Sequence, residues 1–234
     1  MRGRVYADGM KTWRCAVGLT AGVMHLAAAW AQEPELPRPG TVTVADVAGR
    51  LVLVADGQRK ALTADDRVRV GATVATERRS MATLHFSNGA AVQLGSDAEL
   101  EIEEFGQAPA TSASKFAELK AEPTISRTRL RLLRGDIALE VKPLRVARGS
   151  TFTVTLAAGM VKISDGAVRM AITMSEFGLG VCTVELLRGT AEFEPAGGAS
   201  APLVAGRTHT LAVELDRATG SIKVGAMPKA AEKK

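Results

Sequence analysis

From residue 41 onward, short runs of alternating apolar and polar residues are separated by turn residues. Clear examples are 80–86 and 90–94, which flank the sequence Ser87-Asn88-Gly89. In a strand, successive side chains point to opposite faces of the sheet, so one face can be buried while the other meets water. The Asn-Gly pair predicts a hairpin, because a type I′ turn needs positive φ at both central positions. About a dozen such runs predict an all-β fold, an antiparallel β-sandwich or roll of short strands.

A weak internal repeat lies within these runs. Residues 132–140 (LLRGDIALE) are echoed by 186–194 (LLRGTAEFE), and each copy is interpreted as a strand, an Arg-Gly turn and a second strand. Two copies are too few for a solenoid, but they fit a roll built from similar hairpins. The expected strands are 41–47, 50–55, 80–86, 90–94, 99–103, 128–133, 136–141, 151–156, 160–163, 167–174, 181–187, 190–193, 208–215 and 221–224.

Two of the expected strands carry opposite charges at alternate positions. The run 99–103 places Glu at every second position, and the run 127–131 places Arg in the same way, with Arg134 shortly after it. As neighbouring strands they would pair Glu with Arg across the ladder, which would fix register more than stability. Alternatively the arginines form a basic stripe that binds an anionic partner, although the nearby acids would neutralise it. The candidate contact residues are Arg127, Arg129, Arg131 and Arg134.

The segment 106–126 joins these two charged strands. It contains the run Ala-Pro-Ala-Thr-Ser-Ala-Ser, and a short helix is expected at 115–121 with Phe116 and Leu119 on one face. A connection of this length inside a compact domain is usually functional or disordered. We therefore expect this segment to be a mobile contact element.

The first 31 residues predict a signal peptide. A basic start is followed by an apolar stretch at 15–29 and by Ala29-Trp30-Ala31, which fits a small-x-small cleavage site before Gln32. The stretch is shorter than the roughly 20 residues that span a bilayer, so no membrane span is expected after cleavage. Met1 and Met10 are both possible starts. The mature chain is expected to be periplasmic or secreted, with a proline-rich linker at 32–40 and a disordered tail at 226–234.

Removing the leader changes the composition. The whole chain has a net charge of +5, but the leader holds four of the 30 basic residues and one of the 25 acidic ones, leaving 26 against 24. The mature chain is therefore nearly neutral, which argues against nucleic acid as a partner. Both Trp residues and the single Tyr also lie in the leader. Their loss makes sugar platforms and single-strand nucleic-acid grooves less expected.

The mature chain offers little for catalysis. Cys182 is its only cysteine, so no disulfide is expected within the chain, and its apolar surroundings favour a small buried residue. His85 lies between Leu84 and Phe86, so the alternation points it away from the core, and it and His209 are too few for a metal site. Residues 112–115 match Ser-x-x-Lys without the partner motifs of acyl-serine enzymes. We expect no enzyme activity, no cofactor and no metal.

Two segments carry a family resemblance. Residues 70–76 and 80–94 give a glycine-led strand ending in Thr, an apolar strand, an Asn-Gly turn and a strand ending in Leu. This order resembles the core of the FecR domain, and 132–136 and 150–154 resemble its later strand-Gly and Phe-x-Val elements. The resemblance is best over 41–175, within a β domain at 41–225 that includes an extension at 176–225. It implies a periplasmic all-β domain without enzymatic activity.

The best-known FecR proteins relay the state of an outer-membrane transporter to a cytoplasmic sigma factor, through a cytoplasmic helical domain and one membrane span. The leader of this chain is too short for both. We therefore expect a stand-alone exported FecR-like interaction or sensing domain in the bacterial cell envelope, binding another envelope protein or a surface polymer. One alternative is a periplasmic regulator in iron-type cell-surface signalling that acts through a separate membrane partner. Another is a polysaccharide-binding protein.

Overall fold

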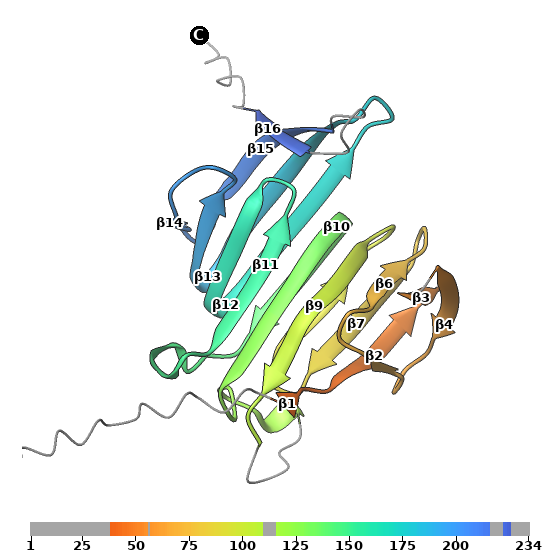
Figure 1. Ribbon diagram of the computed structural model, residues 1–234, viewed down its shortest axis with the longest axis vertical. Helices are drawn as coiled ribbons and strands as arrows, with labels where there is room; N and C mark the ends of the chain where they lie inside the picture. The colour runs from red at the N-terminus through yellow and green to blue at the C-terminus, as the bar shows by residue number, and fades with distance from the viewer. Residues whose placement is uncertain (1–37, 56, 110–115, 216–221, 226–234) are drawn as a thin grey trace, which may run out of the picture. The chain divides into compact units, whose positions relative to one another are not determined.

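The computed structural model describes residues 38–55, 57–109, 116–215 and 222–225, which belong to the unit Pro34–Lys234. The expected signal peptide, most of the linker, the Ser-x-x-Lys match and the expected tail lie outside these residues. The described part consists of strands and two single-turn 3₁₀ helices, so the all-β prediction is confirmed (Figure 1). None of its helical segments has the length and apolar character of a membrane-spanning helix.

The strands are short up to the middle of the chain, and several of the later strands are longer. The first group is β1 (Arg38–Pro39), β2 (Val42–Ala48), β3 (Leu51–Ala55), β4 (Gln58–Leu62), β5 (Arg67–Val68), β6 (Thr73–Thr76), β7 (Met81–Phe86), β8 (Ala91–Leu94) and β9 (Glu99–Gln107). The second group is η1 (Phe116–Glu118), β10 (Ser126–Val141), η2 (Val146–Arg148), β11 (Thr151–Leu156), β12 (Gly159–Met174), β13 (Leu179–Pro195), β14 (Ala201–Pro202), β15 (Thr208–Leu215) and β16 (Ile222–Gly225).

All the strands belong to one sheet that folds back on itself, because the long strands change partners along their length. The first half of β10 pairs with β9 and β11, whereas its second half pairs with β8 and β12. We call the strands around the first half of β10 the first layer (β3, β4, β6, β9 and β11), and those around its second half the second layer (β2, β5, β7, β8, β15 and β16). The β10–β11 pair is parallel, and every other pair is antiparallel.

The sequence repeat was wrongly interpreted as two hairpins with Arg-Gly turns. Arg134-Gly135 lies inside β10 and Arg188-Gly189 lies inside β13, and both strands continue past these residues. The register with the neighbouring strands shifts beside them, and each glycine has a positive φ, 78° at Gly135 and 94° at Gly189. A glycine at φ > 0 in a strand marks a bulge that bends it. The expected pairs of short strands are therefore single long strands that pass between the layers.

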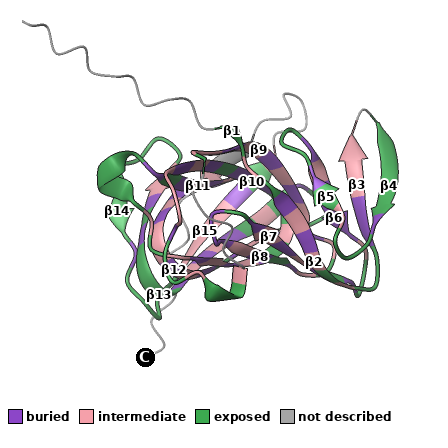
Figure 2. Ribbon diagram, turned by 90° about the horizontal axis from the view of Figure 1, so that it is seen from below, coloured by how far each residue is buried: buried purple, intermediate pink, exposed green. Residues whose placement is uncertain are grey.

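The core lies between the two layers, and three phenylalanines mark its centre. Phe86 of the second layer meets Phe105 and Phe152 of the first in edge-to-face contacts, with ring centroids 5.1 and 6.4 Å apart. All three are buried, and the buried positions alternate with less buried ones along the strands (Figure 2). The alternation in the sequence therefore identified the inward-facing side of each strand.

Two local features differ from the sequence prediction. Arg38 and Pro39, expected in the linker, pair with Gln107 and Gly106 at the end of β9. The hairpin between β7 and β8 is present, but within its turn only Gly89 has a positive φ. The backbone N–H of Phe86 donates to the carbonyl of Ala90, and that of Gly89 donates to the carbonyl of Phe86. This is a three-residue loop and not a type I′ turn. Its Asn88 side chain is buried.

Candidate functional site

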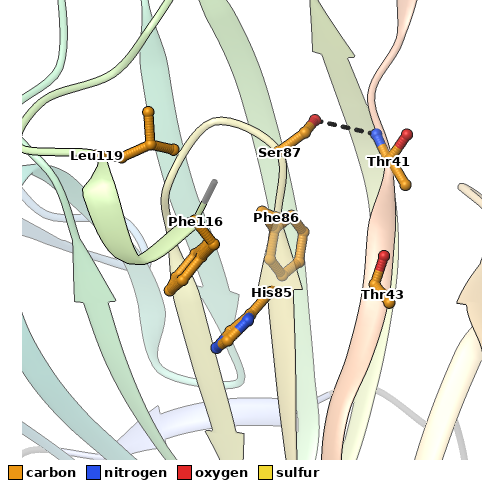
Figure 3. Close-up of a pocket in the computed structure, with 7 residues that line it drawn as sticks. All are labelled: Thr41, Thr43, His85, Phe86, Ser87, Phe116 and Leu119. Atoms are coloured by element: carbon orange, nitrogen blue, oxygen red, sulfur yellow. Dashed lines mark hydrogen bonds between the residues drawn. The ribbon is translucent and has the colours of Figure 1, made fainter. Parts of the chain in front are cut away.

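A pocket of about 270 Å³ opens on the outer face of β2 and β7, where η1 covers the end of β7. Figure 3 shows its lining, in which side chains from two strands face two apolar side chains of the η1 segment. The lining residues are Thr41, Thr43, His85, Phe86, Ser87, Phe116 and Leu119. None of them is a formally charged side chain at neutral pH, so the pocket suits an apolar or hydroxyl-bearing group.

His85 and Phe116 form the wall between strand and loop. Their rings stack with centroids 3.7 Å apart and planes 7° from parallel. His85 lies between buried Leu84 and Phe86 and points outward, as the alternation in the sequence predicts. Partial burial under Phe116 lowers the pKa of His85 below its usual 6.5. The imidazole is therefore neutral at pH 7, which lets it pack flat on an apolar ring.

Hydroxyl groups form the rim of the pocket on the other side. The Ser87 hydroxyl accepts a hydrogen bond from the backbone N–H of Thr41 at 3.1 Å and donates one to Oε1 of Gln107 at 2.6 Å. These bonds tie the β7–β8 turn to the start of β2 and the end of β9. The rim is thus held by one hydrogen bond from the backbone and one to a side chain, and Thr43 lines the pocket beside it (Figure 3).

Glu122 anchors the segment that carries Phe116 and Leu119. The residue is only 1% exposed. One carboxylate oxygen accepts a hydrogen bond from the hydroxyl of Ser126, and the other accepts one from the backbone N–H of Arg145 at 2.9 Å. The Arg145 side chain returns to the same segment, since its Nε donates to the Glu122 carbonyl at 3.2 Å and its Nη2 to that of Pro123. A buried carboxylate is tolerated because these donors replace water.

Further buried polar groups extend these contacts to the β7–β8 turn. The Asn88 amide donates to the hydroxyls of Ser126 at 3.0 Å and Thr128 at 3.2 Å, and its oxygen accepts the N–H of Ala90 at 3.1 Å. The hydroxyl of Ser150 accepts the N–H of Ser126. We call the buried residues Asn88, Glu122, Ser126, Thr128 and Ser150 the Glu122 network. It joins the turn, the η1 segment and the start of β10 at one end of the sheet.

The sequence indicated only part of this site. The segment 106–126 was predicted as a contact element, and Phe116 and Leu119 do line the pocket together, although the expected helix is a single 3₁₀ turn. His85 was predicted to face outward without a role. Glu122 and Asn88 were not identified, because a lone Glu in a loop and an Asn in a turn give no sign of burial. The adjacency of 116–119 to β7 depends on tertiary contacts.

The predicted basic stripe lies beside the acidic strand, as its structural interpretation requires. β9 and β10 are antiparallel neighbours; Arg134 Nε lies 2.8 Å from Glu99, Arg129 lies 3.3 Å from Glu104, and Arg131 pairs with Glu101 and Glu103. Arg127 lies opposite Gly106 and makes no ion pair with a described residue. Three of the four candidate contact residues are therefore neutralised by neighbouring carboxylates.

The remaining candidates of the sequence lie apart from the pocket. Cys182 is a free, buried residue, as its apolar surroundings predict, and burial raises the pKa of its thiol to about 11. His209 pairs in register with buried Val184, and its Nε2 is buried without a hydrogen-bond partner among the described residues. Over the ranges that the structure describes, no three His, Cys, Asp or Glu side chains are grouped as metal ligands.

Comparisons with known proteins give distant similarities in structure alone. No family model matches the chain, and no curated protein sequence matches it. Two solved structures, each of a candidate anti-sigma factor from Parabacteroides distasonis, are similar to it, with TM-scores of 0.42 and 0.40 and identities of 16% and 12%. Each match covers 65% of this chain and 58% of the other. The chain thus spans less than two thirds of the proteins it is similar to.

Proposed function

We propose that this chain is a non-catalytic interaction domain of the FecR type, exported to the bacterial cell envelope, which binds an envelope component at the His85–Phe116 pocket. The observation that carries this proposal is the pocket, an uncharged hollow on an open sheet face with one wall formed by an anchored loop. Binding sites are commonly concave and largely apolar with a few placed polar groups. The pocket has this composition.

The construction of the pocket also supports binding. The η1 segment lies on the surface, yet it is tied down by the buried carboxylate of Glu122 and the backbone of Arg145. A surface loop that served only as a connection would not need a buried anion, whose burial carries an energetic cost. Fixing Phe116 and Leu119 over β7 reduces the ordering cost that a ligand would otherwise meet.

The leader supports the location of this activity, and the FecR resemblance supports a sensing or interaction role within it. A basic start, an apolar stretch at 15–29 and a small-residue site at 29–31 are the parts of an export signal. The bound component would be a protein or a polymer of the envelope.

The proposal is tested by photo-crosslinking in intact cells. A photo-reactive residue replaces Thr43 in the pocket or, as control, exposed Thr173 near the end of β12. We expect a crosslinked envelope component from position 43 but not from 173, and its loss when His85→Ala is added. The purified component should bind the unmodified chain. Equal crosslinking from both positions, or crosslinking that survives His85→Ala, would contradict the proposal.

A further inference from the structure

Two more hollows lie beside the pocket on the outer face of the second layer. One, of about 300 Å³, lies around Ala91, Ala138 and Ala167, and the other, of about 380 Å³, lies around Gly95 and Arg169. The two share Gln93 and Ala138 in their linings. His85, which lines the pocket, lies opposite Ala91 in the β7–β8 register, so the first hollow lies next to the pocket. We call the pocket and the two hollows together the furrow.

The furrow arises from small side chains set among long ones. In the ladders, Ala138 lies between Gln93 of β8 and Arg169 of β12, while Glu140 lies between Ala91 and Ala167. Each alanine leaves a depression bordered by a long polar side chain. Neighbouring strands lie about 4.8 Å apart, so the furrow extends about 14 Å from β7 to β12 and reaches further to β2 through the pocket. Its dimensions suit an extended ligand that crosses the strands.

A ligand on this face can be bound only by side chains. The backbone N–H and C=O groups of β7, β8, β10 and β12 lie in the plane of the sheet and serve its ladders. An extended peptide gains its main-chain hydrogen bonds at a sheet edge, not across a face. The groups offered here are the amide of Gln93, the carboxylate of Asp136 and the guanidinium of Arg169. These planar donors and acceptors suit a ligand with hydroxyl groups along its length.

The charges on this face are balanced within the protein. The carboxylate of Glu140 pairs with Nζ of Lys142 at 3.0 Å and with Nη2 of Arg188 at 3.2 Å. Nη1 of Arg169 lies 4.0 Å from a carboxylate oxygen of Glu185. With Asp136, these are three acidic and three basic side chains. Nearer the pocket, Asp46 opposite Thr83 and Arg67 opposite Thr43 add one charge of each sign. A strongly charged ligand would find no field of one sign to attract it, whereas a neutral one can use the same groups as hydrogen-bond partners.

We propose that the furrow binds a neutral, extended polysaccharide segment, with one sugar seated in the His85–Phe116 pocket and the following ones over the alanines. The proposal rests on the proposed function and names the class of envelope component. The absence of Trp and Tyr from the mature sequence argued against sugar binding. The stacked His85 and Phe116 rings supply an aromatic surface that the sequence did not reveal.

The test is calorimetric titration of the full chain with neutral hexasaccharides of glucose, mannose and N-acetylglucosamine, and with the matching disaccharides. At least one hexasaccharide should bind, and more tightly than its disaccharide by roughly tenfold, because only the longer ligand spans the furrow. Ala138→Arg, which fills the furrow, should weaken this binding by roughly tenfold or more. Thr173→Arg adds the same side chain to the same face outside the lining and should leave binding unchanged.

Failure of this inference can be told apart from failure of the proposed function. If no hexasaccharide binds while photo-crosslinking from the pocket recovers an envelope protein that binds the purified chain, the polysaccharide is wrong and the interaction role stands. If a hexasaccharide binds but Ala138→Arg has no effect, the furrow is not its site. If neither sugar nor pocket-dependent crosslinking is observed, both proposals are overturned. A circular dichroism spectrum of each variant shows whether it retains the native sheet.

Discussion

At the scale of single residues, the site depends on two side chains that are unusual for their positions. His85 is an outward-facing strand residue covered by a ring from another segment, and Glu122 is a loop carboxylate with almost no exposure. The strand pattern predicts that His85 faces outward but not that a ring covers it, and Glu122 lies outside the strands. Both are explained by the η1 segment, which needs a surface to pack on and an internal anchor. Each therefore provides a measurable test of how the segment is held.

The first prediction concerns the pH dependence that His85 adds to stability. Burial lowers its pKa in the folded chain, so the unfolded chain binds the proton more readily. The stability of the folded chain therefore loses nothing to His85 above about pH 6.5. Below that value the stability declines as the unfolded chain takes up the proton, and the decline ends below the lowered pKa of the folded chain. Urea unfolding between pH 7.5 and 5 should show a smaller loss of stability for His85→Gln than for the unsubstituted chain. An NMR titration of the imidazole should give the lowered pKa directly, and a midpoint at or above the usual value would contradict the prediction.

The second prediction concerns the anchor. Glu122→Ala leaves the buried Ser126 hydroxyl and the Arg145 N–H without their acceptor, which should cost about 2–3 kcal/mol of unfolding free energy. Glu118→Ala, an exposed substitution in the same segment, should change it by about 0.5 kcal/mol or less. Urea denaturation measures both. Equal effects of the two substitutions would show that Glu122 does not anchor the segment.

At the scale of elements, the long strands depend on glycines at the places where they pass between layers. Gly166 of β12 and Gly189 of β13 face each other across the ladder, both with positive φ. A Cβ on Gly166 would lie 2.0 Å from the carbonyl oxygen of Arg188, and one on Gly189 would lie 2.4 Å from that of Asp165. The two strands thus approach too closely at the bend for any side chain. The bend is a property of this glycine pair.

The third prediction follows from this close approach. Gly166→Ala should destabilise the chain severely or prevent its folding, because the clash is with backbone and cannot be relieved by rotating a side chain. Gly71→Ala is the matched control, since Gly71 has a positive φ of 84° but open space around its Cβ position. It should cost only the left-handed penalty of about 1–2 kcal/mol. Thermal unfolding followed by circular dichroism compares the two, and similar melting temperatures would contradict the role given to the pair.

The ladder between β9 and β10 gives the fourth prediction. Its arginines pair with glutamates while remaining about half exposed, so Arg131→Gln should reduce stability by less than about 1 kcal/mol. The same substitution should not change binding of heparin, used as a polyanion, at physiological ionic strength, because the surrounding carboxylates cancel the stripe. Urea unfolding and a heparin-column salt elution measure the two effects. A marked loss of heparin affinity would restore the arginines as an anion site.

Particular elements show how far the sequence could predict the structure. The alternation at 151–156 and 208–215 gave β11 and β15 with their bounds, and the opposite charges of 99–103 and 127–134 gave the β9–β10 pairing. The first signal lies within one short segment, and the second is the opposite charge of two segments. The continuity of β10 through Gly135 was missed, because an Arg-Gly pair that begins a turn and one that forms a bulge have the same local sequence. The pocket was missed because its two walls meet only through tertiary contacts.

At the scale of the whole molecule, the two layers give the chain two outer faces of different character. On the first layer, β9 and β10 carry opposite charges that pair closely; on the second, small residues and paired charges leave hollows. The same alternation that fills the core with apolar side chains therefore leaves each outward-facing side free to differ. This separates the stability of the fold from the chemistry of its surfaces, and it is why a fold by itself does not identify the ligand.

The last prediction concerns export, on which the assignment of any envelope partner depends. If the leader is removed after Ala31, the product begins at Gln32 and has lost Trp13, Trp30 and Tyr6, which are all the Trp and Tyr of the chain. The exported protein should therefore show almost no absorbance at 280 nm, and its mass should equal that of residues 32–234.

Substituting Ala29 and Ala31 with bulky residues should block cleavage, because the peptidase requires small side chains there. The uncleaved variant would keep both tryptophans and absorb at 280 nm, which provides the control; an exported wild-type product with Trp absorbance would contradict the signal peptide. Cleavage would also leave a chain with 26 basic and 24 acidic residues, whose net charge is close to zero. Binding of a neutral ligand in the furrow should then depend little on salt concentration.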